Sequence, residues 1–283
     1  MVYEHLVAHA VRKARPLAEP EAAWWLWRRL RRAFPSAVAA CLMPDHVHLI
    51  VSHHGHTGIK GSARLGKVLS GQARHLRASR LWEPARRAPI RDRDKLLRQV
   101  RYVHLNPCRA RLVDDPLRWP WSTHRGAVGA EHEAWVPADR LCKALDGVAA
   151  GFAEWFHGYV SSDPTVAVAG TTFPTPISRR DVPSVPLGSI LAAAVAATPW
   201  ELGAGYRAAR RHLAVSLAWH QGWRDCRLVA RAVGASADGT RRLSKQHDGA
   251  LLRSGLLCLG DQRLRFAEPV ARALLCPDPP GDR

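Results

Sequence analysis

Several patterns that mark common classes of protein are missing from this chain of 283 residues. The six cysteines stand far apart with no C-x-x-C pair, which supports neither a zinc-finger set nor a dense disulfide framework. We therefore expect free thiols in a reducing cytoplasm. The longest apolar run, Ile190 to Ala197, is too short to cross a bilayer, and the first residues lack the apolar core of a signal peptide. These absences predict a cytoplasmic protein that does not enter a membrane.

Acidic residues and lysines are also scarce. The chain has 24 Asp and Glu against 42 Lys and Arg, a formal net charge of +18, and only six of the basic residues are Lys. A surplus of this size favours polyanions such as nucleic acid or an anionic membrane. The planar guanidinium binds two phosphate oxygens at once, but a GC-rich coding sequence explains the arginine excess equally well.

The first half of the chain alternates between strand and helix periodicities. The expected strands are residues 2–10, 36–43, 46–52 and 89–91, and the expected helices are residues 19–34, 61–79 and 93–106. In the first helix we expect Trp24, Leu26 and Leu30 to face the core, with its arginines in solvent. This order predicts an α+β fold in which an antiparallel sheet carries helices on one face.

A change of composition follows. Residues 161–186 contain five prolines and no helical periodicity, which predicts an extended linker or a mobile loop. Beyond them the pattern predicts helices at residues 187–198, 207–220, 224–233 and 240–247. Short helices separated by glycines are compatible with a helix-turn-helix module, and a plain helical bundle fits the same pattern.

Two histidines stand two residues apart in the strand that follows Met43-Pro44-Asp45. Alternate side chains of a strand share one face, so His46 and His48 should point the same way. Two adjacent neutral imidazoles can act as ligands of a divalent metal ion. A half-exposed strand with two polar residues on its wet face is the competing explanation.

The helix at residues 93–106 carries an aromatic residue off its apolar stripe. Leu96, Val100 and Val103 share one arc of the helix, whereas Tyr102 lies away from it and Asn106 follows one turn later on almost the same side. Tyr102 is therefore expected outside the core. It is either a surface residue or, beside the two histidines, a functional one.

Three segments occur together in an order that matches a known family. They are the strand with His46 and His48, the stretch from Arg101 to Val113 and the stretch from Trp119 to Ser122. On these segments the first half of the chain resembles the REP-associated tyrosine transposases, single-tyrosine HUH transposases that cut and rejoin single-stranded DNA. The resemblance implies a ferredoxin-like HUH core at residues 1–125, a helical extension and Pro-rich linker at residues 126–186, and a helical, helix-turn-helix-like DNA-binding domain at residues 187–283.

The same resemblance implies roles for individual residues. Tyr102 would be the nucleophile that forms a 5′-phosphotyrosine intermediate, and His46, His48 and Asn106 would hold Mg²⁺ or Mn²⁺, with zinc as the main competing metal. No nucleotide cofactor is expected.

The expected partner is single-stranded or hairpin DNA, bound by a monomer or a homodimer. Basic residues in and around the expected helices are the predicted phosphate contacts, and a solvated helix face is the competing explanation for each of them. They are Arg64, Lys67, Arg74, Arg77, Arg109, Arg111, Arg241 and Arg242.

One segment departs from the family pattern. Residues 81–87 match poorly the aromatic, glutamine-bearing strand that family members usually carry there. Two other functions therefore stay open, a domesticated DNA-binding protein or repressor that no longer cleaves, and a HUH nickase of the replication or plasmid-transfer type.

Overall fold

The structure is a computed structural model, and it describes residues 2–11, 14–53, 58–198, 205–246 and 248–265. The chain divides into two compact units. Unit 1 comprises residues 1–128 and 135–171, and unit 2 comprises residues 129–134 and 172–283. The short segment 129–134 thus leaves unit 1 and returns to it.

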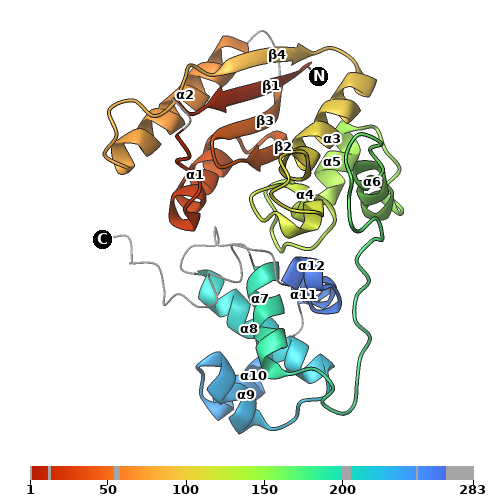
Figure 1. Cartoon of the computed structure of the whole chain (residues 1–283). Helices are drawn as coiled ribbons and strands as arrows, with labels where there is room; N and C mark the ends of the chain where they lie inside the picture. The colour runs from red at the N-terminus through yellow and green to blue at the C-terminus, as the bar shows by residue number, and fades with distance from the viewer. Residues whose placement is uncertain (1, 12–13, 54–57, 199–204, 247, 266–283) are drawn as a thin grey trace. The chain divides into compact units, whose positions relative to one another are not determined.

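Unit 1 is built on one antiparallel sheet with the strand order β2-β3-β1-β4 (Figure 1). The strands are β1 (Val2–His9), β2 (Ala37–Leu42), β3 (His46–His53) and β4 (Arg86–Ile90). Helix α1 (Pro20–Ala33) connects β1 to β2, and helix α2 (Gly58–His75) connects β3 to β4. This β-α-β-β-α-β connectivity is the split β-α-β arrangement of ferredoxin-like folds.

Helix α3 (Arg93–Arg109) follows β4, and smaller helices complete the unit. Asp92 caps α3, because its side chain accepts a hydrogen bond of 2.6 Å from the backbone N–H of Lys95. Such a cap stabilises a helix by about 1 kcal/mol. The smaller elements are a 3-10 turn (Pro116–Arg118), α4 (His124–Ala127), α5 (Ala138–Ala144) and α6 (Phe152–Ser161).

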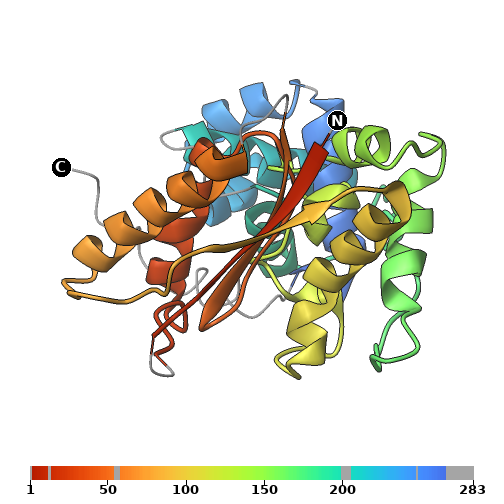
Figure 2. The same cartoon turned by 90° about the horizontal axis from the view of Figure 1, so that it is seen from above.

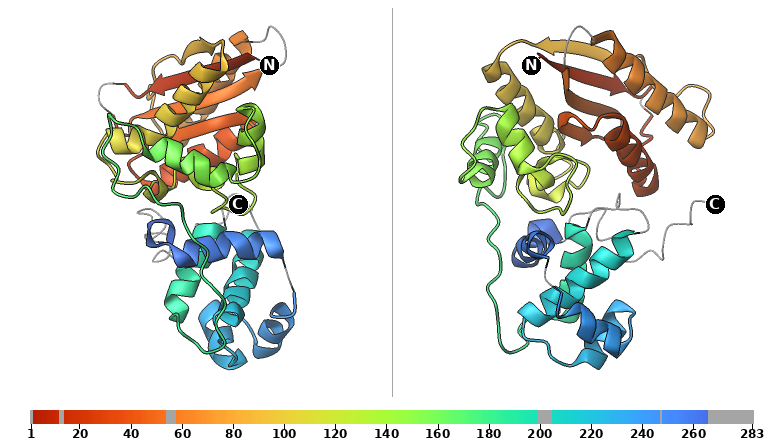
Figure 3. Two further views of the ribbon diagram at one scale, coloured as in Figure 1. Left: turned by 90° about the vertical axis from the view of Figure 1, so that its right-hand side faces the viewer. Right: turned by 180° about the vertical axis from the view of Figure 1, so that it is seen from behind.

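Helices cover both faces of the sheet, so the prediction that they lie on one face was incomplete. Every residue of β2 is buried, which requires packing on each side of the strand. Helices α1 and α2 lie on one face, and α3 lies on the other (Figures 2 and 3). Leu6, Val47 and Leu49 point toward α1 and α2, while alternate residues of β1 and β3 point toward α3.

The third helix extends further than its sequence predicts. Pro107 disfavours helical geometry at the preceding residue, yet α3 continues through it to Arg109. The backbone carbonyls around the proline find partners, because Ala110 N–H donates to the Asn106 carbonyl and Leu112 N–H donates to the Pro107 carbonyl. Pro107 is itself buried, and this packing offsets the lost backbone donor.

The predicted face of α1 packs against the core, and Trp27, which was not predicted there, belongs to it as well. Leu26 and Leu30 are fully buried as expected, but Trp27 is the buried tryptophan and Trp24 is only half-buried. The Arg28 guanidinium lies 4.5 Å from the centre of the Trp24 ring. A long basic side chain can cover an aromatic surface that faces solvent.

Unit 2 is helical in the part that the structure describes. Its helices are α7 (Leu187–Ala197), α8 (Gly205–His220), α9 (Cys226–Val233), α10 (Ala237–Leu243), α11 (Gly249–Gly260) and α12 (Gln262–Arg265). Gly222, at φ +84°, lies against the backbone of Val182, and a Cβ atom there would come within 2.5 Å of the Val182 carbonyl carbon. This contact fixes the end of α8 against the segment that precedes α7, and only glycine fits it.

A three-residue turn joins α9 to α10. Gly234 ends α9 in the left-handed conformation, and the Ser236 side chain caps α10 by accepting from the Gly239 N–H. Helix α10 was predicted at residues 240–247, of which residue 247 lies outside the described residues. It spans residues 237–243, because Gly239 is accommodated in the capped first turn.

Five cysteines, all except Cys276, lie in the described residues and are free thiols. Cys276 lies outside the described residues. Among the described helices, none is both long enough and apolar enough to span a membrane.

Candidate active site

Four histidines meet on the face of the sheet that α3 covers. In the register of β1 and β3, His9 lies opposite His46, and Val7 lies opposite His48. The ring centres of His46 and His48 are 4.8 Å apart, and the His9 ring stacks on the His46 ring with 5.0 Å between their centres. His5 completes the group from the same face of β1.

Each of the two histidines among the predicted metal ligands has a partner that orients its ring. His5 Nε2 lies 3.0 Å from His48 Nδ1, and Asp45 Oδ1 lies 2.7 Å from His46 Nδ1. In both imidazoles the Nδ1 atom is therefore engaged, and the buried Nε2 atom of His48 has no hydrogen-bond partner among the described residues. Metal-binding histidines have this arrangement, in which a hydrogen bond at one ring nitrogen fixes the tautomer and direction of the other.

Burial favours the neutral forms of His5, His46 and His48. It lowers the pKa of His5 to about 4, against a smaller opposing effect of the hydrogen bond with Gln99. The pKa of His48 also falls well below its ordinary value, first through burial and then through the neighbouring histidines. Burial likewise lowers the pKa of His46, although Asp45 opposes the shift. At neutral pH these side chains offer nitrogen lone pairs rather than positive charge.

Asn106 brings an amide to the same place. Its side chain is within hydrogen-bond reach of His46, and it projects from the last turns of α3. Among the described residues, none hydrogen-bonds to His48 Nε2 or to Asn106 Nδ2, although both atoms are buried. Buried polar atoms normally have partners, so His48 Nε2 in particular points to a ligand, whereas Asn106 would bind a cation through its amide oxygen.

Two imidazoles and an amide are a donor set that fits a divalent cation with open positions. In the part of the chain that the structure describes, no group of three or more His, Cys, Asp or Glu side chains is arranged to hold a metal ion. A metal bound by His46, His48 and Asn106 would therefore need further ligands from water or from a bound phosphate.

Tyr102 lies beside this set. Its side chain is 38% exposed, so it lies outside the core as its helix position predicts. The centre of its ring lies 5.6 Å from the centre of the His48 ring, edge to face, and 6.4 Å from the centre of the His5 ring. A phenol held at the rim of a cluster of neutral imidazoles is accessible to a substrate from solvent.

Arg109 covers Tyr102 from the end of α3. Its guanidinium lies 5.5 Å from the centre of the Tyr102 ring and donates to Asp163 at 3.0 Å. Asp163 also pairs with Arg101 at 3.2 Å and accepts hydrogen bonds from the backbone and the hydroxyl of Thr165. Thr165 and the two arginines together lower the pKa of this carboxyl, although burial alone would raise it. The loop after α6 thus fixes the arginine that contacts the tyrosine.

The other predicted phosphate contacts lie on several elements, and only some of them lie near one another. Lys67 and Arg74 are exposed on α2, whereas Arg64 donates to the Ala33 carbonyl and so links α2 to α1. Arg77 and Arg111 have positive φ angles of 54° and 55° and are exposed just after α2 and α3.

In unit 2, Arg241 and Arg242 are exposed on α10, and Arg241 pairs with Asp238.

Sequence reasoning missed His5 and His9. They lie about 40 residues before the histidine pair, and the strand register that joins them depends on long-range pairing. Their spacing of four residues in a strand was the available signal, because it puts both on one face. Asp163 was missed because it lies in the Pro-rich segment, where no periodicity singles it out.

Comparisons with known proteins find a similar solved structure but no matching family model. No family model matches the sequence, and no curated protein matches it. A solved structure described as the structure of the REP associates tyrosine transposase bound to a REP hairpin is similar to this chain at a TM-score of 0.39 and 20% sequence identity. The match covers 44% of this chain and 78% of that one.

Proposed function

We propose that this protein is a single-tyrosine HUH transposase, a metal-dependent enzyme that cleaves and rejoins single-stranded or hairpin DNA. The observation that carries the proposal is the contact of Tyr102 with His48, whose outer ring nitrogen is buried without a partner among the described residues. Neither a surface tyrosine nor a core histidine requires this pairing. Residues 1–125 would form the catalytic core, residues 126–186 an extension and linker, and residues 187–283 a DNA-affinity domain that includes α9 and α10.

The cleavage step is assigned to Tyr102. Tyr102 is the nucleophile: its phenol loses a proton as the oxygen bonds to phosphorus, and the bond to the 3′ oxygen breaks. The products are a 5′-phosphotyrosine and a free 3′-hydroxyl, which takes up a proton. One phosphoester replaces another, so the step is reversible without ATP.

His46, His48 and Asn106 would hold the cation. A bound Mg²⁺ or Mn²⁺ supplies charge neutralisation at a non-bridging phosphate oxygen. His5 and Asp45 orient the two imidazoles, and Arg109 holds the tyrosine ring and contributes positive charge next to the attacked phosphate.

An end-labelling experiment tests the proposal. Single-stranded DNA from the flanks of the gene is labelled at the 3′ end and incubated with the protein and Mn²⁺. A 5′-phosphotyrosine retains the 3′ fragment, so label should appear on denatured protein, whereas 5′-labelled DNA should give only a shortened free strand. Tyr102→Phe should abolish the adduct, and Tyr159→Phe, a matched change in the same unit, should retain it.

An adduct that persists in Tyr102→Phe contradicts the nucleophile assignment. DNA binding without any adduct in the unaltered protein would favour the non-cleaving DNA-binding protein or repressor.

A further inference from the structure

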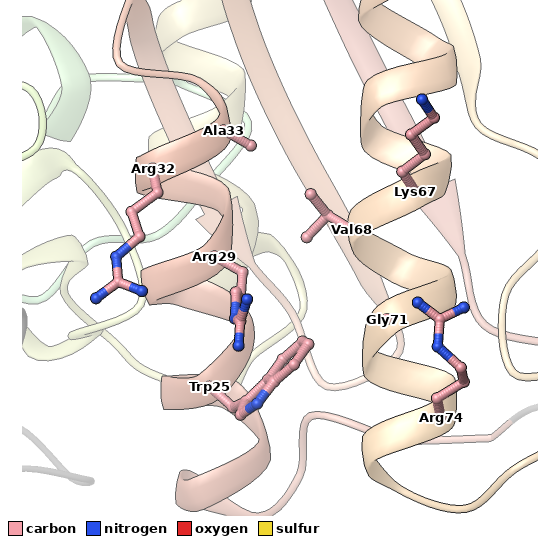
Figure 4. Close-up of a pocket in the computed structure, with 8 residues that line it drawn as sticks. All are labelled: Trp25, Arg29, Arg32, Ala33, Lys67, Val68, Gly71 and Arg74. Carbon is pink, nitrogen blue, oxygen red and sulfur yellow. The ribbon is translucent and has the colours of Figure 1, made fainter. Parts of the chain in front are cut away.

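A basic groove lies between α1 and α2, on the face of the sheet opposite the histidine cluster (Figure 4). It has a volume of about 520 Å³. Arg29 and Arg32 line it from α1, and Lys67 and Arg74 line it from α2. We call these four side chains the groove cations.

No carboxylate in the described part of the chain neutralises the groove cations. The two helices together carry eight Lys or Arg residues and one acidic residue, Glu21. Among the described residues, none forms an ion pair with any groove cation, in contrast to Arg87, which pairs with Glu4 at 3.0 Å. Like charges that converge on one concave surface raise the local potential, and an anion there relieves it.

The side chains of Trp25, Arg29 and His75 pack against one another in the wall of the groove. The Trp25 ring stacks on His75 at 4.9 Å, and the Arg29 guanidinium lies 5.0 Å from the centre of the same ring. At Gly71 a Cβ atom would lie 3.5 Å from Trp25, an ordinary contact distance, so α2 packs directly against this ring. This stacking holds Arg29 in place before any ligand arrives, which reduces the entropy lost on binding.

The spacing of the cations favours a chain of phosphates over a single ion. Lys67 and Arg74 are seven residues apart on one helix, a rise of about 10.5 Å, and Arg29 and Arg32 are separated by about 4.5 Å along the other. The charges thus extend along the groove instead of meeting at one point. A concave strip is also poorly shaped for the flat surface of a membrane.

We propose that the groove between α1 and α2 binds the phosphate backbone of a nucleic-acid strand. This site lies on the opposite face of the sheet from Tyr102, so it goes beyond the proposed cleavage site. It requires neither the metal nor the nucleophile.

The test compares two full-length variants of equal charge, both made in a Tyr102→Phe background so that covalent capture cannot contribute. Arg29→Gln with Lys67→Gln removes one groove cation from each helix. Arg15→Gln with Arg91→Gln removes two exposed loop arginines of the same unit. Binding of a fluorescent 20-nucleotide single strand is measured by anisotropy over a range of salt concentrations, and thermal melts check that both variants fold.

We expect the groove variant to bind about tenfold more weakly at 0.1 M salt, and its slope of log K against log salt to fall by about 1.4, since each lost phosphate contact contributes about 0.7. The loop variant should keep the parent slope. Equal changes in the two variants would show a net-charge effect and overturn the site. Vesicles of phosphatidylserine and phosphatidylcholine are the second probe, and an equal loss of vesicle binding would overturn the nucleic-acid assignment.

Because the readout is equilibrium binding, an inactive protein does not affect this result. Failure of the groove and failure of the cleavage proposal are therefore distinguishable.

Discussion

His5 Nε2 lies 3.0 Å from His48 Nδ1, so a buried residue of the first strand fixes the ring of a histidine 43 residues later. If His48 binds a cation through Nε2, its Nδ1 carries the proton and donates a hydrogen bond to His5 Nε2. His5 is then a positioning residue of the metal site.

We expect His5→Phe to lower Mn²⁺ affinity by about 10- to 100-fold, the usual effect of removing a partner of a metal ligand. His5→Gln, which retains a hydrogen-bonding group, should lose less. Isothermal titration calorimetry measures both. Unchanged affinity in His5→Phe would show that the contact only packs the sheet.

Replacing the predicted ligands themselves should have a larger effect. His46→Ala and His48→Ala are each expected to reduce Mn²⁺ binding below detection and to abolish the DNA adduct, because two of three protein donors cannot hold the cation. DNA affinity measured without metal should change little. His9→Ala is the matched control, since His9 stacks on His46 but is not a predicted ligand.

Removing the negative charge of Asp163 should destabilise the fold, because Asp163 pairs with both Arg101 and Arg109. Asp163→Asn leaves Arg101 and Arg109 without their carboxylate, and we expect the free energy of unfolding to fall by about 1–3 kcal/mol. Chemical denaturation measures the change. Asp114→Asn removes an exposed pair with Arg118 and should cost less than about 1 kcal/mol. Equal effects would mean that the Asp163 pairs behave as ordinary surface ion pairs.

A fully buried histidine on α3 should make the fold sensitive to acid. Burial lowers the pKa of His104 to about 3, whereas an unfolded histidine titrates near 6.5. Between these pH values the unfolded chain binds more protons, so the free energy of unfolding falls as the pH drops, by up to about 1.4 kcal/mol per pH unit for this residue. Above about pH 6.5 both states hold His104 neutral, so protonation of this residue no longer lowers the free energy of unfolding.

Urea denaturation at several pH values between 4 and 7 checks this expectation. His104→Gln, which can still hydrogen-bond to Thr123, should show a shallower pH dependence whatever its absolute stability. An identical slope in the variant would assign the acid sensitivity to other groups.

In unit 2 the exposed arginines of α10 should add to DNA affinity. Arg241→Gln with Arg242→Gln is expected to reduce the salt slope for duplex DNA by about 1.8, at about 0.9 per phosphate contact. Arg179→Gln with Arg253→Gln is a control of equal charge elsewhere in the unit. If the two variants have the same slope, α9 and α10 serve packing or a protein partner instead.

Local sequence patterns predicted much of unit 1. Two-residue alternation put His46 and His48 side by side, and the helical arc put Tyr102 outside the core, because both features depend only on neighbours in the chain. The helix with the tyrosine was placed correctly at its start, where Asp92 caps it, and too short at its end, where tertiary packing overrides Pro107.

The rest depends on contacts that no local pattern encodes. The pairing of β1 with β3 brings in His5, and the packing of α1 on α2 brings Arg29 to the same groove as Lys67. Asp163 reaches α3 from a segment whose composition predicts only a linker. In each case the sequence separation is large, and the strand register or helix packing that closes it is a property of the whole fold.

The two edges of the sheet also bear on how the protein behaves at high concentration. At the β2 edge, Leu42 N–H donates to the Trp121 carbonyl and Thr123 N–H donates to the Ala40 carbonyl, so the chain itself occupies that edge. At the β4 edge, Pro89 lacks a backbone donor, and Arg86 and Arg87 are exposed charges. Charges and proline on an edge strand oppose pairing with a second sheet. Growth of the sheet into fibrillar aggregates is therefore disfavoured at both ends.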